Sequence, residues 1–397
     1  MLGGGMAEGG PKILIVAGET SGEAHAARLA KALRERDPSC RLFGVGGSAM
    51  RAEGVELIAE GDLGVIGFAE VVRHLPELLR VGRRLDRFFR EERPDLFIPV
   101  DYPGFNLRMC RRAKQAGIPV MYYISPQVWA WGRGRVNTIA RRVDTMVTIL
   151  PFEKPLYESA GVDVEFVGHP LLESLLEEEI SSRRALEDMK IEGKRVLGLL
   201  PGSRENEVAR LFPIMLETAA ELRKEFPEIQ VLVGASSPER AAQVGRMIPD
   251  AYSWATVVTG RTRGVIRAAE LVLVASGTAT LEAACLETPM VVVYRLSLLS
   301  WLIGRAVIRV PHIALANLVA GGPVVPERVQ YNATSRNLAR EAADLLRSAE
   351  RREAMGAALR AVRGRLGTPG ASARAAGVAL ALISRARSQR TSGECSR

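Results

Sequence analysis

Three segments of this sequence combine glycine, hydroxyl and charged side chains in spacings that suit phosphate groups. They are GETSGE (18–23), LPGSRENE (200–207) and ASGTATLE (275–282). Each follows a short apolar run and opens an amphipathic stretch. Each is therefore predicted to begin a helix, where backbone N–H groups and the helix dipole attract anions. The first segment is neither G-x-G-x-x-G nor a P-loop, which disfavours a nicotinamide dehydrogenase.

The second segment carries the clearest signal. Gly202 frees the backbone, Ser203 can cap a helix, and Arg204 is placed to bind a phosphate at the helix N-terminus. We favour phosphate binding here over a merely capped helix, because the three residue types coincide at the end of one predicted strand. In GETSGE, by contrast, an ordinary strand-to-helix turn with Ser21 as the N-cap is slightly favoured.

The third segment suits a diphosphate. Gly277, Thr278 and Thr280 supply small groups and hydroxyls, and Glu282 could accept hydrogen bonds from ribose hydroxyls. Helix capping with a glutamate favoured by the helix dipole is the alternative. Two phosphate-suited turns in one half of the chain together indicate a nucleotide-sugar site, although either alone would be weak evidence.

A candidate base ends another apolar run, in IPVDYPGFN (98–106). Asp101 follows the predicted strand, and Pro103 and Gly104 then force a turn that would point the carboxylate into a cleft, where it could act as a general base. An N-cap aspartate is the commoner role for such a residue. Asn106 could orient a sugar hydroxyl or simply fill the first helical turn.

Aromatic residues make up only 5% of the chain, yet residues 122–136 gather several of them beside arginines. The segment contains Tyr122, Tyr123, Trp129, Trp131, Arg133 and Arg135. Aromatic faces suit sugars and guanidinium groups suit phosphates, while core packing remains the alternative. The four histidines show no metal-ligand spacing, so no metal site is expected, and His169 is interpreted as structural.

Along the chain, short β-branched apolar runs alternate with longer amphipathic stretches. This pattern is typical of parallel α/β proteins. Helices are expected over 24–36 and 105–116, and the stretch 335–385 is expected to be purely helical. Strands are predicted at 12–19, 41–47, 95–101, 119–125, 144–150, 164–170, 195–203, 229–236, 270–277 and 289–295. A glutamate-rich connector, 173–193, separates two Rossmann-like halves, and ligands are expected in the cleft between them.

Composition narrows the class of protein. The 397 residues, 47% of them hydrophobic, allow two folded domains, and a net charge of +9 attracts nucleic acid, anionic lipid or phosphorylated substrates without choosing among them. The four cysteines form neither a close pair nor a metal cluster, which fits a reducing compartment. No signal peptide opens the sequence, and Arg305 and Arg309 interrupt the longest apolar stretch, 296–310, before it could span a bilayer.

One segment has the pattern of a membrane-surface helix. Residues 64–90 interleave apolar residues with arginines at helical spacing, which suits an anionic bilayer. An ordinary amphipathic helix packed on the sheet is equally favoured. A second membrane or acyl-chain candidate surrounds Trp301, where a buried helix is the alternative.

The motifs resemble, in order, those of the lipid-A-disaccharide synthase family. Those quoted for the resemblance are GETSGE, VGGSAM, GFAEV, VDYPGFN, YYISPQVWAW, LPFE, FVGHP, LPGSRENEV, SGTATLE, PMVVVYR and NLVAGGPVVPE-x-x-Q, from Gly18 to Gln330. The resemblance implies a GT-B-type α/β fold. Its N-terminal acceptor and membrane-facing domain would cover 11–172, joined by C-terminal helices of about 350–388. Its UDP-sugar domain would cover 173–349, with disordered tails at 1–10 and 389–397.

The resemblance also implies an activity. UDP-2,3-diacylglucosamine and 2,3-diacylglucosamine 1-phosphate would give a β-1,6-linked disaccharide 1-phosphate and UDP, with inversion at the anomeric carbon. No metal and no cofactor are implied, because GT-B enzymes usually stabilise UDP with arginine and helix dipoles. The protein would act in the cytoplasm at the inner-membrane surface of a Gram-negative bacterium, without a nucleic-acid partner, and a homodimer is left open.

The resemblance assigns roles residue by residue. Asp101 would be the base for the acceptor 6-hydroxyl, or position it, and Arg204 would neutralise the leaving diphosphate. The other implied site residues are Ser203, Gly277, Thr278, Glu282, Asn317 and Gln330 for the nucleotide sugar, and Glu19, Ser21 and Asn106 on the acceptor side. Two rival functions remain. A hydrolysing UDP-N-acetylglucosamine 2-epimerase is disfavoured by GETSGE and YYISPQVWAW, and a non-catalytic sugar-nucleotide-binding membrane protein by the intact Asp101 and Arg204.

Overall fold

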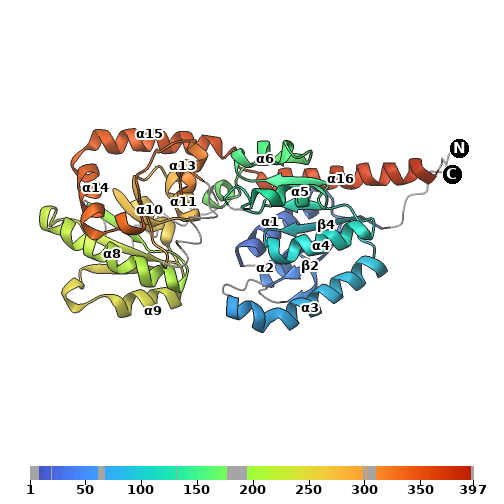
Figure 1. The fold of residues 1–397 in the computed structure, drawn as a ribbon, viewed down its shortest axis with the longest axis horizontal. Helices are drawn as coiled ribbons and strands as arrows, with labels where there is room; N and C mark the ends of the chain where they lie inside the picture. The colour runs from blue at the N-terminus through green and yellow to red at the C-terminus, as the bar shows by residue number, and fades with distance from the viewer. Residues whose placement is uncertain are drawn as a thin grey trace. The chain divides into compact units, whose positions relative to one another are not determined.

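A computed structural model describes residues 9–18, 20–60, 68–130, 132–176, 195–297, 301 and 310–394. Side chains of residues 20–21, 68–74, 133 and 390–394 lie outside the description. The chain forms two compact units, shown in Figure 1. Unit 1 comprises Met1–Pro170 and Thr368–Arg397, and unit 2 comprises Leu171–Gly367.

Unit 1 is built on a parallel sheet of seven strands in the order β3-β2-β1-β4-β5-β6-β7. The strands are β1 (Lys12–Ala17), β2 (Arg41–Gly46), β3 (Glu56–Glu60), β4 (Leu96–Val100), β5 (Met121–Tyr123), β6 (Thr145–Thr148) and β7 (Asp163–Phe166). The central strands β1 and β4 are almost wholly buried, because helices cover both faces of the sheet. Their apolar runs made them recognisable in the sequence.

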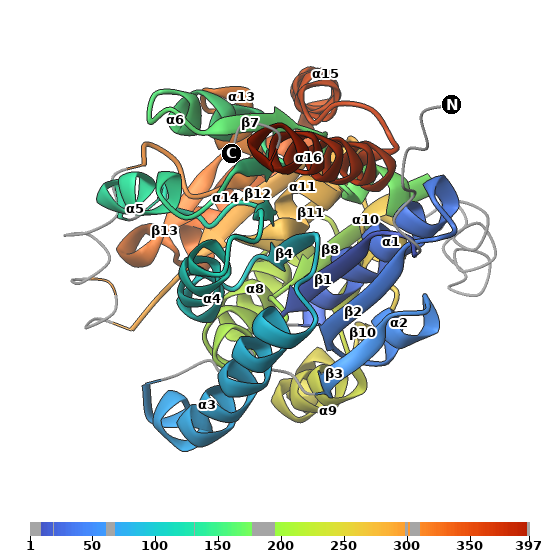
Figure 2. The ribbon, with the colours of Figure 1, turned by 90° about the vertical axis from the view of Figure 1, so that its right-hand side faces the viewer.

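The helices of unit 1 lie on both sides of this sheet (Figure 2). They are α1 (Thr20–Arg36), α2 (Ser48–Ala52), α3 (Phe68–Glu91), α4 (Pro103–Gln115), α5 (Val136–Ala140), α6 (Lys154–Glu158) and α16 (Ala371–Glu394). α1 and α16 pack together on one face, and α3 and α4 pack together on the other. The predicted return of the chain to unit 1 near residue 350 comes one helix later. The reason is that α15 (Ala349–Arg365) packs within unit 2, on α11 (Thr278–Cys285), α13 (Leu315–Ala320) and α14 (Ser335–Arg347).

Unit 2 repeats the plan with a parallel sheet of six strands in the order β10-β9-β8-β11-β12-β13. The strands are β8 (Val196–Leu200), β9 (Gln230–Ala235), β10 (Ala255–Thr259), β11 (Leu271–Ala275), β12 (Met290–Tyr294) and β13 (Glu327–Val329). The helices include α8 (Glu205–Glu225), α9 (Pro238–Met247), α10 (Thr262–Ala268), α11 (Thr278–Cys285), α13 (Leu315–Ala320) and α14 (Ser335–Arg347).

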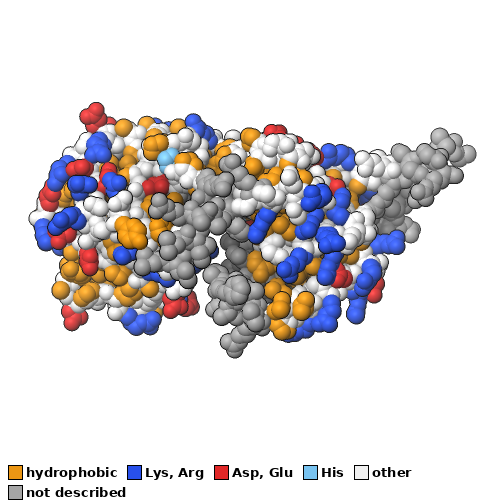
Figure 3. Space-filling model, in the orientation of Figure 1, with side chains coloured by type: hydrophobic (Ala, Val, Ile, Leu, Met, Phe, Trp, Pro, Cys, Tyr) orange, Lys and Arg blue, Asp and Glu red, His pale blue; other side chains and the backbone are white. Residues whose placement is uncertain are grey.

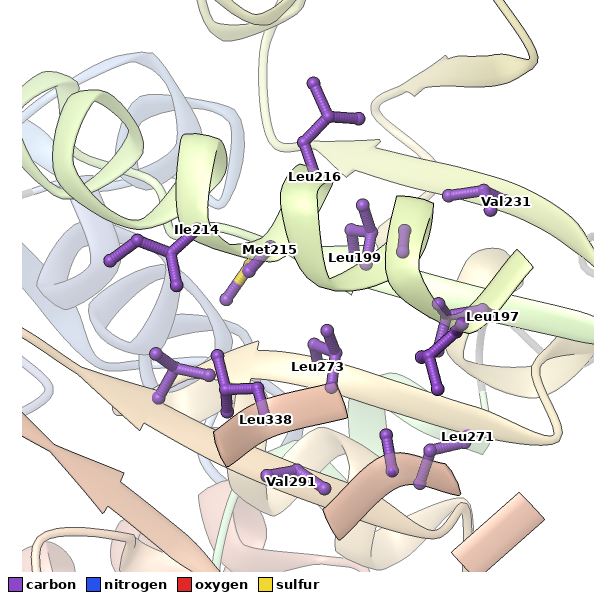
Figure 4. Close-up of a cluster of buried hydrophobic side chains, with 14 of the residues drawn as sticks. Leu197, Leu199, Ile214, Met215, Leu216, Val231, Leu271, Leu273, Val291 and Leu338 are labelled. Atoms are coloured by element: carbon purple, nitrogen blue, oxygen red, sulfur yellow. The ribbon is translucent and has the colours of Figure 1, made fainter. Parts of the chain in front are cut away.

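One face of the unit 2 sheet forms a large apolar core with α8 and α14. Figure 4 shows Leu197, Leu199 and Leu273 from the strands meeting Met215 of α8 and Leu338 of α14. All five side chains are fully buried. Burying a Leu or Met side chain contributes roughly 1.5–3 kcal/mol to folding. This core holds β8 and β11 firmly, and the turns that follow these two strands are the predicted phosphate sites.

Both sheets have the strand order 3-2-1-4-5-6 of a Rossmann fold, with a seventh strand added in unit 1. The direction of winding reverses between β1 and β4 in unit 1, and between β8 and β11 in unit 2. Ligands of such sheets bind at this switch point, beyond the carboxyl ends of the strands. The predicted α/β class with two Rossmann-like sheets is therefore confirmed.

Candidate functional site

The switch point of unit 1 brings together GETSGE and Asp101, which follow the adjacent strands β1 and β4. Their contact is close, because a Cβ atom added at Gly18 would overlap the ring of Tyr102. Asp101 and Tyr102 both have positive φ, 46° and 47°. Non-glycine residues are strained in this region, and such strain is concentrated at functional sites.

The backbone of Asp101 is held by hydrogen bonds on both sides. Its N–H donates to the carbonyl of Tyr123 at 3.1 Å, and its carbonyl accepts from the Tyr122 hydroxyl at 2.6 Å and from Asn106 Nδ2 at 2.8 Å. Asn106 is fully buried, and its amide also donates to Val100 at 3.2 Å. Asn106 therefore holds the Asp101 turn, and its predicted contact with the acceptor stays a prediction.

The remaining acceptor-side predictions are Glu19 and Ser21. Glu19 lies outside the described residues, and so does the side chain of Ser21, although its backbone lies in the first turn of α1. Glu23, the last residue of the same motif, accepts a hydrogen bond from the backbone N–H of Ala49 at 2.8 Å, which joins α1 to the start of α2. One residue of the motif thus holds two helices together, which the sequence did not reveal.

A buried carboxyl that the sequence analysis missed lies beside the aromatic segment. Glu153 is almost fully buried and accepts hydrogen bonds from Trp129 Nε1 at 3.2 Å and from the Leu150 N–H at 3.2 Å. Burial raises its pKa to about 8, although the hydrogen bonds from Leu150 and Trp129 oppose the shift. Glu153 ties the loop after β5 to the loop after β6, and the LPFE motif was the available signal.

The aromatic residues of this segment do not act alike. Tyr122 and Tyr123 are fully buried in the sheet, which is the core packing left open by the sequence. Trp129 is only partly buried and meets Phe152 edge to face, with ring centroids 5.2 Å apart. Trp131 lies outside the described residues. Of the aromatic side chains described in this segment, Trp129 is thus the one that could offer a ring to a ligand.

Two histidines of unit 1, the buried His169 and the half-buried His25, are kept neutral. Burial lowers the pKa of His169 to about 3, with a smaller contribution from His25, and burial lowers the pKa of His25 to about 4. A neutral histidine inside the unit is consistent with the structural role predicted for His169. Neither residue would carry a positive charge near neutral pH.

In unit 2, the turn after β8 has the positive-φ glycine that its sequence predicted, but the residue that caps α8 is Arg204 and not Ser203. Gly202 has φ +111°, and Arg204 is the N-cap of α8, with its backbone N–H 3.4 Å from a Glu207 carboxylate oxygen. The Arg204 side chain is 59% exposed and lies 3.4 Å from the other oxygen of Glu207. Such an exposed pair is weak, so the guanidinium is available to exchange Glu207 for a phosphate.

The turn after β11 lies next to it, because β8 and β11 are neighbours in the sheet. Gly277 has φ +152° and open space around it, and Thr278 is exposed. Thr280 is buried and donates its hydroxyl to the Gly277 carbonyl at 2.8 Å, so it shapes the turn. One Glu282 oxygen accepts from Arg263 Nε at 3.0 Å.

Asn317 has its hydrogen-bonding capacity engaged within the protein. It is fully buried, donates to Val325 at 2.9 Å and to Glu327 at 2.7 Å, and accepts from Val324 at 2.8 Å and Val325 at 2.9 Å. Glu327 in turn accepts from the backbone N–H of Ala314 at 2.9 Å. Asn317 therefore holds the loop around α13, and its predicted contact with the donor stays a prediction.

Gln330 lies at the end of β13 with a positive φ of 52°. Its amide pairs with the backbone of Leu296, accepting from the N–H at 3.0 Å and donating to the carbonyl at 3.1 Å. This pair fixes the chain that leaves β12. Gln330 also lines a cavity of about 490 Å³, together with Arg210, Arg295, Leu296, Ser297 and Tyr331. Gln330 thus lies at a pocket, but its own amide is already engaged.

The described part of the chain shows neither a metal-binding cluster nor a membrane-spanning helix. Within it, no group of three or more His, Cys, Asp or Glu side chains is arranged to hold a metal ion. None of the helices described there is long and apolar enough to cross a membrane. The second candidate around Trp301 falls mostly on residues that the structure does not describe.

Comparison with known proteins agrees with this geometry. The lipid-A-disaccharide synthetase family profile matches residues 13–375. A lipid-A-disaccharide synthase of Syntrophus aciditrophicus is 45% identical, covering 94% of this chain and 97% of the relative. One of Nitrosococcus oceani is 43% identical, covering 91% and 94%.

Among solved structures, a UDP-GlcNAc 2-epimerase from Neisseria meningitidis bound to UDP-GlcNAc superimposes with a TM-score of 0.63. The alignment covers 94% of this chain and all of the epimerase. At 12% identity this likeness shows a shared fold only. The close relatives and the matched profile settle the family, and the chain belongs to the lipid-A-disaccharide synthases, which are glycosyltransferases.

Proposed function

We propose that this protein joins UDP-2,3-diacylglucosamine to 2,3-diacylglucosamine 1-phosphate, releasing UDP and a β-1,6-linked lipid A disaccharide 1-phosphate. The acceptor 6-hydroxyl attacks the anomeric carbon, the bond from that carbon to the UDP oxygen breaks, and the hydroxyl proton passes to a base. A single in-line displacement inverts the anomeric carbon and needs no covalent intermediate.

The observation that supports the proposal is that the sequence motifs lie at the switch points of the two sheets. The two turns suited to phosphate follow β8 and β11, the neighbouring strands at the switch point of unit 2. The strained Asp101 follows β4 at the switch point of unit 1. Membership of the lipid-A-disaccharide synthase family, matched over residues 13–375, supports the choice of acylated glucosamine substrates.

Unit 2 would stabilise the leaving UDP. The N-termini of α8 and α11 present backbone N–H groups at adjacent positions, and Arg204 adds a positive charge close to them. As the sugar bond breaks, negative charge grows on the diphosphate, so fixed donors and a guanidinium favour the transition state. Ser203 and Thr278, both exposed at these turns, would add hydroxyl hydrogen bonds, and Glu282 would hold the ribose.

Asp101 would accept the proton of the 6-hydroxyl. A base must be held in place before it can act, and the hydrogen bonds from Asn106 and Tyr122 to the Asp101 carbonyl hold this turn. The positive φ values of Asp101 and Tyr102 indicate that the surrounding fold holds these residues in a conformation that is unfavourable for non-glycine residues.

α3 would bring unit 1 to the inner-membrane surface, where both acylated substrates reside. Its inner face buries Val81, Leu85 and Phe89, while Leu75 and Leu79 are 42% and 56% exposed. Exposed arginines follow at positions 80, 83, 84, 87 and 90. On the face of unit 1 in Figure 3, Lys and Arg side chains are spread among apolar ones. Exposed leucines beside arginines suit an anionic lipid surface.

A product assay tests the function. Purified protein in detergent would receive both acylated substrates with chelator present, and mass spectrometry should detect UDP and the disaccharide 1-phosphate. Asp101→Asn should lower kcat by at least about 100-fold, the usual contribution of a positioned base, while retaining UDP affinity. Arg204→Ala should weaken UDP binding in calorimetry.

Other results would point elsewhere. Folded protein that makes no disaccharide, with chelator or with added divalent metal, would favour an epimerase, to be tested with UDP-N-acetylglucosamine alone, or a binding protein. Normal turnover by Asp101→Asn would remove the base assignment. Unchanged UDP affinity in Arg204→Ala would place the diphosphate elsewhere.

A further inference from the structure

Unit 2 contains a pocket that the proposed roles of the phosphate turns leave unused. It has a volume of about 490 Å³ and is lined by Arg210, Arg295, Leu296, Ser297, Gln330 and Tyr331. Small-molecule sites commonly occupy about 300–1,000 Å³, so it is large enough to receive part of a substrate. We call it the Arg210–Arg295 pocket.

The pocket has two cations, for which the described part of the chain supplies no paired carboxylate. Within the described residues, neither Arg210 nor Arg295 forms an ion pair or a side-chain hydrogen bond. Both are exposed, so they can meet a ligand from solution. Two guanidinium groups around one pocket form a site for phosphate, which they can bind in a bidentate way.

The pocket wall is rigid and partly apolar. Gln330 has a positive φ of 52° and is pinned to the Leu296 backbone through both ends of its amide. Tyr331, which follows it, is 72% exposed. An exposed ring and a leucine beside two arginines suit an amphiphilic anion better than a free inorganic ion. A strained non-glycine residue at a pocket also indicates that the fold maintains this wall.

The pocket lies close to the phosphate turns but is not the same place. Arg210 lies six residues beyond the N-cap Arg204, which is about 9 Å along α8. Arg295 follows β12, which is one strand beyond β11, and Gln330 follows β13, two strands beyond, at about 4.8 Å per strand. The charges of Glu207 and Arg204 both influence the pKa of the Tyr294 hydroxyl. The end of β12 therefore lies near the turn that follows β8.

We propose that the Arg210–Arg295 pocket binds the phosphate of an acylated glucosamine phosphate, with the two guanidinium groups on the phosphate oxygens and Leu296 and Tyr331 against neighbouring apolar atoms. The inference rests on the proposed function, which supplies two such phosphates. One is the diphosphate of the donor, extended beyond the Arg204 turn, and the other is the 1-phosphate of the acceptor. Both have the same chemistry, and the experiment separates them.

The test compares Arg210→Gln, Arg295→Gln and the double variant with Arg246→Gln. Arg246 is also an exposed arginine of unit 2, but it lies at the end of α9, which packs on β9 and β10 at the other edge of the sheet. α9 also packs on α8, but Arg246 does not line the pocket, so the control loses the same charge outside the pocket lining. Each protein is measured for its melting temperature, for UDP affinity by calorimetry, and for kcat and the KM of each substrate.

We expect the double variant to raise a substrate KM by about tenfold or more, the usual effect of losing a charge-assisted hydrogen bond, without changing the melting temperature. A raised acceptor KM with unchanged UDP affinity would assign the pocket to the acceptor 1-phosphate. A raised donor KM with weakened UDP binding would assign it to the donor diphosphate. If both KM values and the UDP affinity match those of Arg246→Gln within about twofold, the inference is overturned.

Direct binding measurements test the pocket even if the proposed reaction does not occur. If the wild type makes no disaccharide, binding of 2,3-diacylglucosamine 1-phosphate in detergent micelles and of UDP is measured directly by calorimetry. Loss of either affinity in the double variant, but not in Arg246→Gln, would retain the pocket. Equal affinities in all these proteins would reject it.

Discussion

At the residue scale, the candidate site depends on a few backbone positions that the surrounding fold holds under strain. Asp101, Tyr102 and Gln330 have φ between 46° and 52°, a conformation that costs a non-glycine residue of order 1–3 kcal/mol. Buried amides offset this cost: Asn106 holds the Asp101 turn, and Gln330 is itself bonded to Leu296. The strained positions therefore coincide with or adjoin residues to which the proposed function gives a role at the ligand.

The buried carboxyl of Glu153 makes stability depend on pH. Burial raises its pKa from 4.5 to about 8. The unfolded chain releases this proton near pH 4.5, whereas the folded protein keeps it until about pH 8. Its stabilising contribution is therefore complete below about pH 4.5 and is lost as pH rises to about 8. We expect Glu153→Gln to flatten the fall in unfolding free energy between pH 5 and 8, measured by urea unfolding.

The control for this prediction is Glu217→Gln, which changes an exposed carboxyl on α8. His25 and His169 act in the opposite direction, because their lowered pKa values favour folding as pH rises towards 6.5. They are present in wild type and variant alike, so the difference between the two proteins isolates Glu153. A wild-type-minus-variant difference that stays constant across pH 5 to 8 would contradict the prediction.

The sequence predicted residues that lie on turns better than residues that lie inside. Gly202, Arg204 and Gly277 were recognisable because glycine and charge at the end of a buried strand are seldom needed for packing alone. Asn317 was recognised by its motif, but its four internal hydrogen bonds depend on partners that only folding brings near. Glu153 was missed because the LPFE motif marks its position but does not show that its carboxyl is buried.

At the element scale, α3 is unusual in offering apolar side chains on two faces. Val81, Leu85 and Phe89 repeat every four residues and pack on the sheet, which accounts for the ordinary amphipathic interpretation. Leu75 and Leu79 are also four apart but are exposed, so that interpretation does not explain them. The two alternatives left open by the sequence therefore apply to different faces of one helix.

We expect the double variant Leu75→Ser, Leu79→Ser to bind vesicles containing anionic lipid at least about tenfold more weakly, because each leucine contributes roughly 1.5–3 kcal/mol when it leaves water. Vesicle sedimentation measures this, with Leu176→Ser as a control, since Leu176 of unit 2 is similarly exposed. Equal vesicle binding by the double variant and the control would remove α3 from the membrane contact.

The central strands of both sheets were predicted, and most of the edge strands were missed. β1, β4, β8 and β11 are continuous apolar runs because helices cover both faces. The edge strands β3, β10 and β13 have few buried residues and were not predicted, whereas the edge strand β7 was predicted at 164–170. An edge strand is specified largely by its neighbour's unpaired backbone, which leaves little trace in its own residues.

At the scale of the whole molecule, one strand order is used twice, and the last helix of the chain completes the first unit. α16 presents Ala375, Ala376 and Ala379, all fully buried, to a sheet face that it shares with α1. Small residues let helices approach closely, and Arg387 then pairs with Asp95 at 2.9 Å. Unit 1 therefore remains incomplete until the end of the chain has been added.

Removing α16 should consequently damage unit 1 and spare unit 2. In a chain that ends at Gly367, we expect rapid proteolysis within residues 9–170, because the apolar face beneath α16 becomes exposed to water. UDP affinity should remain near that of the full chain, since the proposed nucleotide turns and their core belong to unit 2. A chain that ends at residue 389 retains Arg387 and should behave as wild type. If the shorter chain resists protease as the full chain does, α16 is dispensable for unit 1. If it loses UDP binding as well, the two units do not fold independently.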